Sequence, residues 1–143
     1  MERFEHIIVD GYNIMNGWSC LKKMIDKSLG FRRSCLIATL QDFSDYVDKY
    51  VSIVFDGSDK KELIENNGKL RIIFSKKTEA ADTVIERLVY KDKGKNKILV
   101  VTDDKLEQNM VFGFGASFIN SKDFEKIILS AVSDLEDNFR QRG

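Results

Sequence analysis

Five short hydrophobic segments constrain the fold of this chain more than any other feature. They are rich in β-branched residues and nearly continuous in hydrophobicity, which is typical of strands buried on both faces of a parallel sheet. The segments are 6–9, 51–55, 70–74, 98–102 and 116–119.

Amphipathic patterns separate these segments, with apolar residues three and four positions apart. They predict helices over 34–50, 78–90, 104–112 and 121–135, and a weaker one over 59–67. Strands that alternate with helices imply right-handed crossovers and a sheet covered by helices on both faces. The 143 residues therefore predict a single α/β domain, a three-layer α/β/α sandwich of about five parallel strands, with a frayed polar tail over about 136–143.

Composition excludes several classes of protein. The 23 Lys and Arg residues balance 23 Asp and Glu residues, so any nucleic acid must bind to local patches rather than to a basic field. Because no apolar run approaches the ~18–20 residues that span a bilayer, we expect no membrane partner and a cytoplasmic location. Cys20 and Cys35 are too few for a thiolate metal site, and we expect them to be reduced.

Aspartates stand at the carboxyl ends of three predicted strands. Asp10 follows the first strand, Asp56 the second, and the pair Asp103 and Asp104 the fourth. In an open α/β sheet ligands bind beyond these ends, where the strand order reverses. A further acidic group opens the helix after the third strand, and it consists of Glu79, Asp82 and Glu86.

Carboxylates that converge repel one another, and a hard cation relieves that repulsion. Oxygen ligands alone suit Mg²⁺ or Mn²⁺, which activate water and neutralise charge on a phosphate in flight. This pattern favours metal-assisted phosphodiester cleavage. The alternative for any single acid is a loop or helix-capping role, since aspartates commonly occupy those positions.

The segment after the first strand is Asp10-Gly11-Tyr12-Asn13. Gly11 permits a sharp turn, and the amide of Asn13 can orient water or contact a phosphate. Tyr12 can stack on a base, or it can pack on the end of the sheet.

Several motifs, taken in order, resemble the YacP-type NYN domains, a bacterial branch of the PIN-like nucleases. The resemblance extends over about residues 6–133. It rests on Val9-Asp10-Gly11-Tyr12-Asn13-Ile14-Met15 with Gly17-Trp18, Val54-Phe55-Asp56, Thr78-Glu79-Ala80-Ala81-Asp82, Ile85-Glu86-Arg87-Leu88, Val101-Thr102-Asp103-Asp104 with Glu107-Gln108, and Phe112-Gly113-Phe114-Gly115-Ala116.

The resemblance implies a PIN-like sandwich with strand order 3-2-1-4-5 and an endoribonuclease activity. It places the acidic site on Asp10, Asp56, Asp82 and Asp104, with Asn13 beside it. Asp103 stands where the family usually has Ser, so either it or Asp104 is the ligand, and we favour Asp104. The family also implies cleavage of mRNA at the ribosome, although longer members carry a basic C-terminal extension that is not present after Gly143.

Cations beside aromatic residues follow the first strand and predict a track for single-stranded RNA. A solvated helix face is the alternative for this segment. The residues are Tyr12, Trp18, Lys22, Lys23, Lys27, Arg32 and Arg33.

The sequence thus predicts an endoribonuclease that depends on Mg²⁺ or Mn²⁺ and cleaves single-stranded RNA, with no DNA partner. We expect Asp10, Asp82 and Asp104 to hold one or two metal ions, and Asp56 to be an outer ligand or to orient the ligands. Asp103, Glu79 and Glu86 are further candidates. Two alternatives are a protein that binds RNA or ribosomes without cleaving, and a phosphoacceptor-like signalling module. The second is disfavoured because Gly11 stands where that module needs another acid.

Overall fold

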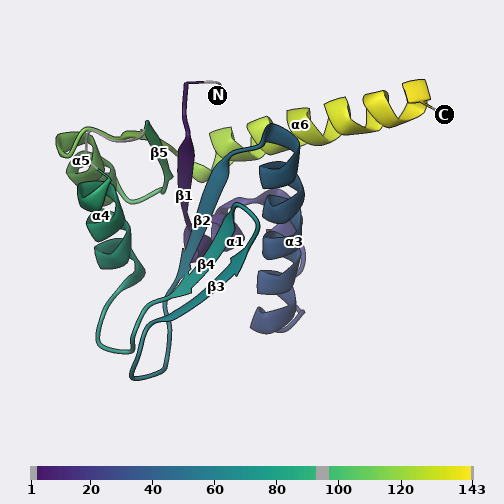
Figure 1. The fold of residues 1–143 in the computed structure, drawn as a ribbon. Coiled ribbons are helices and arrows are strands. Elements are labelled where there is room, and N and C mark those ends of the chain that lie inside the picture. Colours follow the sequence, from purple (N-terminus) through teal and green to yellow (C-terminus); the bar gives the residue numbers. More distant parts are fainter. Residues whose placement is uncertain (1–2, 93–96, 143) are drawn as a thin grey trace.

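A computed structural model describes residues 3–92 and 97–142. A central sheet separates two layers of helices (Figure 1). The elements in chain order are β1 (His6–Asp10), α1 (Gly11–Gly17), α2 (Ser19–Lys22), α3 (Leu29–Val47), β2 (Tyr50–Phe55), β3 (Leu63–Asn67), β4 (Leu70–Phe74), α4 (Ala81–Lys91), β5 (Ile98–Val101), α5 (Lys105–Gly113), β6 (Ser117–Ile119) and α6 (Ser121–Arg142).

The sheet has six strands in the order β3-β4-β2-β1-β5-β6. Five of them run parallel, and their order confirms the predicted arrangement of the five hydrophobic segments. β1 lies at the centre, with Val9 paired to Ile53 of β2 and to Val101 of β5. Both faces of these central strands are covered, which explains their nearly continuous hydrophobicity.

The sixth strand corrects the prediction of a helix over 59–67. β3 pairs antiparallel with β4 through a two-residue turn in which Gly68 has φ 61°. A hairpin turn of this length commonly needs positive φ, which glycine adopts without strain. All five residues of β3 are exposed, so this edge strand lacks the apolar pattern that marked the others.

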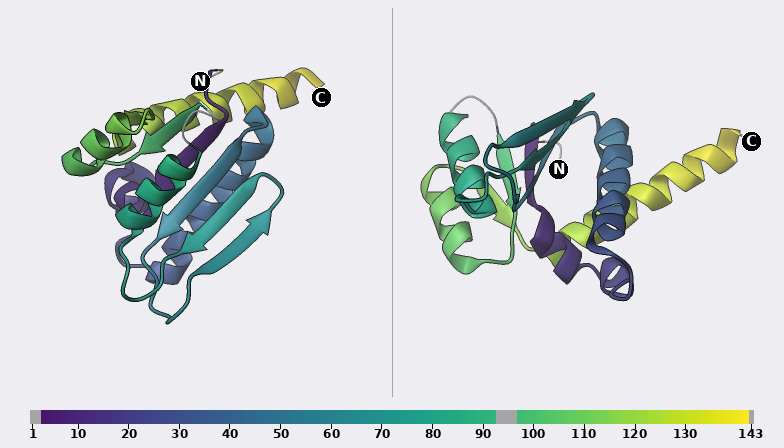
Figure 2. Two further views of the ribbon diagram at one scale, coloured as in Figure 1. Left: turned by 60° about the vertical axis from the view of Figure 1, so that its left-hand side comes forward. Right: turned by 90° about the horizontal axis from the view of Figure 1, so that it is seen from below.

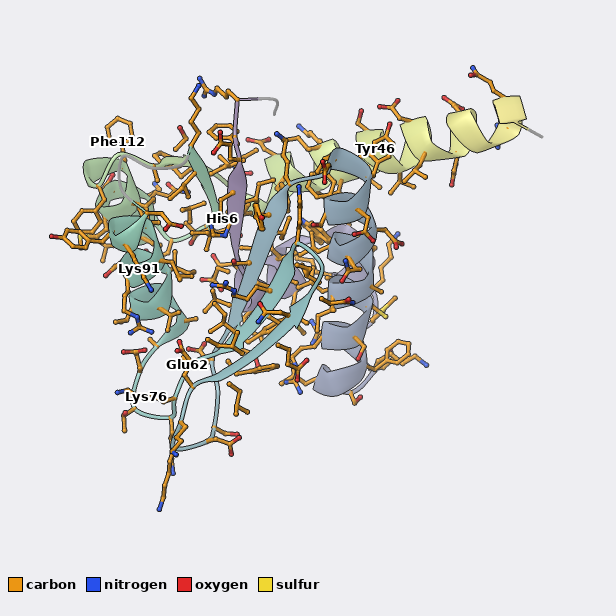
Figure 3. All side chains as sticks on the ribbon, viewed as in Figure 1. His6, Tyr46, Glu62, Lys76, Lys91 and Phe112 are labelled. Carbon is orange, nitrogen blue, oxygen red and sulfur yellow. The ribbon has the colours of Figure 1, made fainter. Side chains whose placement is uncertain are left out.

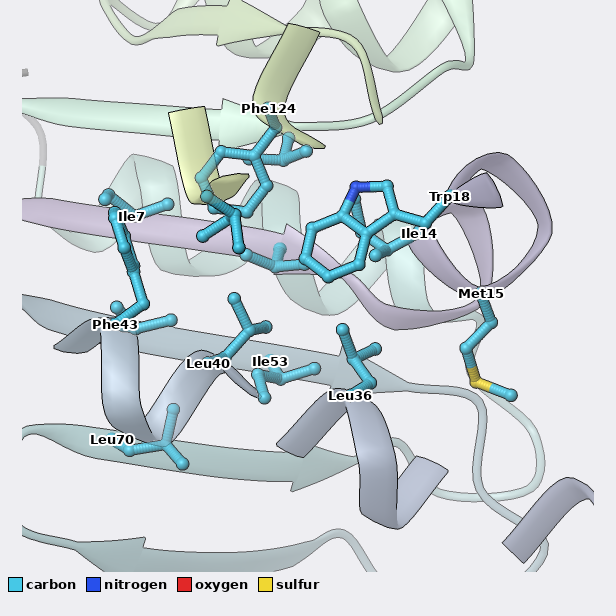
Figure 4. Packing of buried hydrophobic residues seen from close by; sticks show 14 of the residues in the cluster. Ile7, Ile14, Met15, Trp18, Leu36, Leu40, Phe43, Ile53, Leu70 and Phe124 are labelled. Carbon is cyan, nitrogen blue, oxygen red and sulfur yellow. The ribbon is translucent and has the colours of Figure 1, made fainter. Parts of the chain in front are cut away.

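Two apolar cores lie on opposite faces of the sheet. The larger core joins β1, β2 and β5 to α1, α3 and α6, and the smaller joins the other face to α4 and α5. Trp18 lies within the larger core, 6.0 Å from the ring of Phe124, and Leu36 and Leu40 of α3 contribute to the same core (Figure 4).

Helix boundaries differ from the prediction where side-chain caps decide them. α3 begins earlier than expected because the Ser28 hydroxyl accepts a hydrogen bond from the Phe31 amide. α4 begins at Ala81, so Thr78 does not cap it. α6 extends past Leu135 to Arg142 and projects beyond the sheet (Figure 1).

No helix in the described ranges combines the length and the apolar character needed to cross a bilayer. Cys20 and Cys35 are free thiols.

The parallel strands bring their carboxyl ends to one edge of the sheet, as the face-on view in Figure 2 shows. In the orientation of Figure 3 this is the lower edge, where Glu62 and Lys76 mark the loops after β2 and β4. His6, at the start of β1, lies higher in the same view. The predicted acids are therefore carried at the lower edge.

Candidate active site

Asp10 is the last residue of β1 and the N-cap of α1. Its carboxylate accepts a hydrogen bond from the Asn13 amide at 3.3 Å, as an N-cap side chain does. Gly11 is the first residue of the helix, and a Cβ there would lie 2.3 Å from the Phe55 ring. Glycine is thus required by close packing against β2 and not by a left-handed turn.

Asn13 connects the ends of β1 and β5. Its Nδ2 donates to Asp10 at 3.1 Å, while its Oδ1 accepts from the Asp103 amide at 2.6 Å and from the Thr102 hydroxyl at 3.4 Å. The Thr102 hydroxyl in turn accepts from the Asp104 amide. Asn13 is therefore a positioning residue that fixes the Asp10 carboxylate against the neighbouring strand.

The Asp10 carboxyl is only 9% exposed and lies near two other acids. Burial, and to a lesser extent the negative charges of Asp56 and Asp82, raise its pKa to about 6, although hydrogen bonds from the α1 backbone act in the opposite direction. Asp10, Asp56 and Asp82 are thus close enough to interact, as expected for carboxylates at one edge of a parallel sheet.

Asp56 and Asp82 both lie at the start of α4. The Oδ1 atom of Asp56, which directly follows β2, accepts from the Ala81 amide at 2.8 Å. Asp56 therefore caps α4, whose own N-cap residue Ala80 has no side-chain oxygen. Asp82 occupies the first turn, where the helix dipole favours a negative side chain. This cap holds the start of α4 at the end of β2, close enough to β1 for the charge of Asp82 to affect Asp10.

Glu107, in the first turn of α5, is the acid that the sequence did not single out. It is 2% exposed, and its Oε1 has no hydrogen-bond partner in the described structure. Burial, a hydrogen bond to Glu86, and the charges of Asp82 and Asp10 hold its pKa far above the usual range. Glu107 therefore holds its proton more tightly than an exposed glutamate does.

A sequence signal for Glu107 does exist. Glu107 and Val111 are four residues apart, and these two are the buried residues of α5. A carboxyl on the apolar face of a helix is rarely buried without a partner.

Asp103 and Asp104 support the starts of two different helices. Both oxygens of Asp103 hold Ser121 at the start of α6, at 2.8 Å to the amide and 2.7 Å to the hydroxyl. Asp104 is the N-cap of α5, and its Oδ1 accepts from the Leu106 amide at 2.9 Å. Binding a metal would then fall to the second oxygen of Asp104.

Glu79 belongs to a separate group of charges. Its two oxygens each lie 3.0 Å from Arg87, which also pairs with Glu62. Glu79 thus stabilises the loop before α4.

The acids Asp10, Asp82, Glu86 and Glu107 have the chemistry of a divalent cation site, although their side chains are not arranged around a common point. Within the described ranges, no three acidic, histidine or cysteine side chains form a group that could hold a metal ion. The donors are nonetheless all carboxylate oxygens, one is buried without a partner, and like charges raise two of their pKa values. A hard cation relieves each of these unfavourable features.

The predicted RNA-binding residues divide into exposed and buried sets. Lys22, Lys23 and Lys27 are exposed. Arg32 is half-buried and donates to the Met15 carbonyl at 3.4 Å. The prediction for Trp18 is wrong, because its ring is 2% exposed and its Nε1 donates to the Ser121 carbonyl.

Tyr12 and Arg33 form part of a cavity of about 380 Å³ beside the cluster, which Asp56 also lines. The larger cavity, of about 590 Å³, lies at the opposite edge of the sheet. There His6 contacts Ser52 at 2.8 Å and Asp92 at 3.5 Å.

Known proteins resemble this chain in sequence and in fold. The YacP protein of Bacillus subtilis (strain 168) is 31% identical over 142 residues, which cover 95% of this chain and 79% of that protein. The crystal structure of Rae1 (YacP) from B. subtilis in its W164L form superposes with a TM-score of 0.83 at 28% identity, covering 96% of this chain and 82% of that one. A second crystal structure of Rae1 (YacP) gives a TM-score of 0.79 at 30% identity, over 94% of this chain and 79% of that one.

The family model described as YacP-like NYN domain matches residues 7–142. NYN domains belong to the nuclease-like PIN superfamily, in agreement with the acids at the carboxyl edge of the sheet. The chain therefore belongs to the YacP-like NYN family and is a nuclease-like domain.

Proposed function

We propose that this protein is an endoribonuclease that depends on Mg²⁺ or Mn²⁺ and cleaves single-stranded RNA. The observation that carries the proposal is the cluster of Asp10, Asp82, Glu86 and Glu107 at the carboxyl end of the sheet. Asp10 and Glu107 are buried there, and burial together with neighbouring negative charges raises the pKa of both. Holding these groups together without a cation is unfavourable, so their presence needs a functional reason.

A bound divalent cation would supply an activated water and neutralise charge on the phosphate. Asp10 and Asp82 would hold it, with Glu86 and Glu107 completing the set and Asp104 contributing through its second oxygen. Asn13 keeps Asp10 oriented, and Asp56 keeps α4, and with it Asp82, in place. None of the acids needs to act as a nucleophile.

Exposed lysines give the RNA a path toward this edge. Lys22, Lys23 and Lys27 precede α3, and Lys60 and Lys61 follow β2. Their charges favour phosphate contacts, whereas the overall charge balance leaves the rest of the surface unattractive to RNA. We further propose mRNA as the natural substrate, engaged at the ribosome in the cytoplasm.

Cleavage assays test both parts of the proposal. Wild-type protein and Asp10→Asn would be incubated with single-stranded RNA, with duplex RNA and with mRNA in a translating extract, in Mn²⁺, Mg²⁺ or chelator. Asp123→Asn, on the exposed surface of α6, is the matched control. We expect metal-dependent cuts by the wild type and the control but not by Asp10→Asn.

Cleavage of naked single-stranded RNA would show that the ribosome is dispensable, and cleavage in the extract alone would show that it is required. Absence of cleavage in every format would contradict the proposal and favour a protein that binds RNA without cutting it.

A further inference from the structure

We propose that the cavity beside the acid cluster binds a single nucleobase of the RNA and thereby selects which phosphate is cut. This proposal rests on the proposed function. The cavity measures about 380 Å³, within the ~300–1,000 Å³ range of small-molecule sites. Its main walls are Tyr12, Leu29, Arg33, Leu63 and Phe74, and Asp56 stands at its edge.

Flat groups line the cavity in a way that suits an aromatic ring. Phe74 stacks on Phe55 with 5.4 Å between ring centroids, and Tyr12 meets Phe55 edge-on at the same distance. The Arg33 guanidinium lies 5.8 Å from the Phe74 ring centroid and donates to the Tyr12 hydroxyl at 3.4 Å. Aromatic faces and an arginine plane are the groups on which unpaired bases stack.

Two apolar side chains that line the cavity are exposed to solvent. Leu29 and Leu63 are each 46% exposed and approach the cavity from α3 and β3. A base inserted between them would cover this apolar surface. Lys61, which also lines the cavity, carries a charge suited to a phosphate.

The position of the cavity links it to cleavage. Asp56 lines it, and the charge of Asp56 reaches Asp10. Tyr12 is two residues beyond Asp10 on α1. A base held here therefore places an adjacent phosphate at the acid cluster, so occupancy fixes the register of the strand.

β3 supplies a matched pair of test positions. Leu63 lies opposite Phe74 and lines the cavity, whereas the next residue, Ile64, lies opposite Ile73 on the other face. Ile64 is 50% exposed, nearly the same as Leu63. Leu63→Trp would fill the cavity, and Ile64→Trp would place the same ring outside it.

The experiment measures binding in chelator, where no cleavage occurs. A fluorescent single-stranded RNA and the same RNA with one abasic nucleotide would be titrated into wild type, Leu63→Trp and Ile64→Trp. We expect Leu63→Trp to weaken binding of the intact RNA by about 5- to 100-fold, the range for one stacked base, and Ile64→Trp to match the wild type. The abasic RNA should bind all three proteins equally.

Phe74→Leu provides a second variant that removes the stacking ring while keeping an apolar side chain. It should also weaken binding of the intact RNA alone, with thermal unfolding confirming that each variant is folded. Unchanged or tighter binding by Leu63→Trp, or equal losses on both RNAs, would overturn the proposal. Because the readout is binding, a wild type that cleaves while Leu63→Trp binds normally would refute the pocket and leave the nuclease standing.

Discussion

Asp10 and Glu107 hold protons more tightly in the folded protein than in the unfolded chain. The pKa of Asp10 rises from its ordinary value of 3.8 to about 6, and the pKa of Glu107 rises from its ordinary value of 4.5 to about 9. A group with a raised acidic pKa binds more protons when folded, so the free energy of unfolding falls as pH rises through that window. The metal-free protein should therefore lose stability between about pH 4 and 6 through Asp10, and from about pH 4.5 up to about 9 through Glu107.

Glu107→Gln should stabilise the metal-free protein at neutral and alkaline pH. Glutamine keeps the shape and can donate to Glu86, but it carries no charge that must be buried. We expect a gain of about 1–3 kcal/mol at pH 8 and a smaller difference near pH 4. Urea unfolding in chelator at several pH values measures this gain.

The control for this substitution is Glu136→Gln, an exposed acid of α6. It should leave the pH dependence of stability unchanged. If Glu107→Gln is no more stable than the wild type at pH 8, the buried carboxyl is not under the repulsion that the structure indicates. The same variant should cleave RNA poorly, because stability gained at an active site commonly lowers activity.

At the scale of elements, the two acids after β5 support different helices. Asp103 holds α6 through Ser121, whose side chain is buried, and Asp104 caps α5 next to Glu107. Adjacent aspartates that look equivalent in the sequence thus have separate structural roles, and only Asp104 lies on an element of the acid cluster.

Asp103→Ala should lower stability by about 1–3 kcal/mol, because it leaves the buried Ser121 hydroxyl and amide without their acceptor. Cleavage measured well below the unfolding temperature should be nearly unchanged. Asp104→Ala should instead lose cleavage in the same assay. Loss of cleavage in Asp103→Ala with stability intact would reverse the assignment and make Asp103 the ligand.

The contact between α1 and β2 explains why glycine follows Asp10. Gly11→Ala would bring a methyl group against the Phe55 ring and should lower the free energy of unfolding by about 1–3 kcal/mol. Gly113→Ala, in α5 where no heavy atom lies within 4 Å of an added Cβ, is the matched control. It should be neutral or stabilising by up to ~1 kcal/mol.

Phe55→Leu combined with Gly11→Ala should recover part of the loss if the clash is with this ring. Thermal and urea unfolding of the two single variants and the double variant measures the loss and its recovery. Equal effects at Gly11 and Gly113 would contradict the close-packing explanation.

The elements that could be predicted from the sequence are those buried on both faces. β1, β2, β4 and β5 could be predicted because most positions along them are buried and apolar. β3 could not be predicted, because it is fully exposed and its stability depends on pairing with β4. α1 is too short for a helical period, and it forms because Asp10 caps it.

Some residues of the candidate site could also be predicted from the sequence, and others could not. Asp10, Asp56 and Asp82 follow from their places at strand ends and helix starts. Glu107 could not be predicted because its burial depends on how α5 packs against α4. Trp18 was assigned to RNA from its basic neighbours, yet its ring completes the core with Phe124 (Figure 4).

At the scale of the whole molecule, the topology brings acidic and basic side chains to the same end of the sheet. Parallel strands deliver the acids there, α4 and α5 bring Glu86 and Glu107 against them, and the loops and α2 add exposed lysines. The opposite edge holds the larger cavity with His6 but none of these acids. One edge of the sheet therefore combines the donors for a cation with the charges for RNA phosphates.

The most direct test of the acid cluster compares RNA cleavage by wild type and Asp82→Asn, in Mn²⁺ and in chelator. Within the described residues, the Asp82 carboxylate accepts a hydrogen bond from the adjacent Thr83 amide and caps no other helix, so its replacement should leave the fold intact. We predict cleavage by the wild type in Mn²⁺ alone, and a loss in Asp82→Asn beyond the roughly 10- to 100-fold effect of removing an outer metal contact. Cleavage by Asp82→Asn at the wild-type rate, or wild-type cleavage that persists in chelator, would contradict the account.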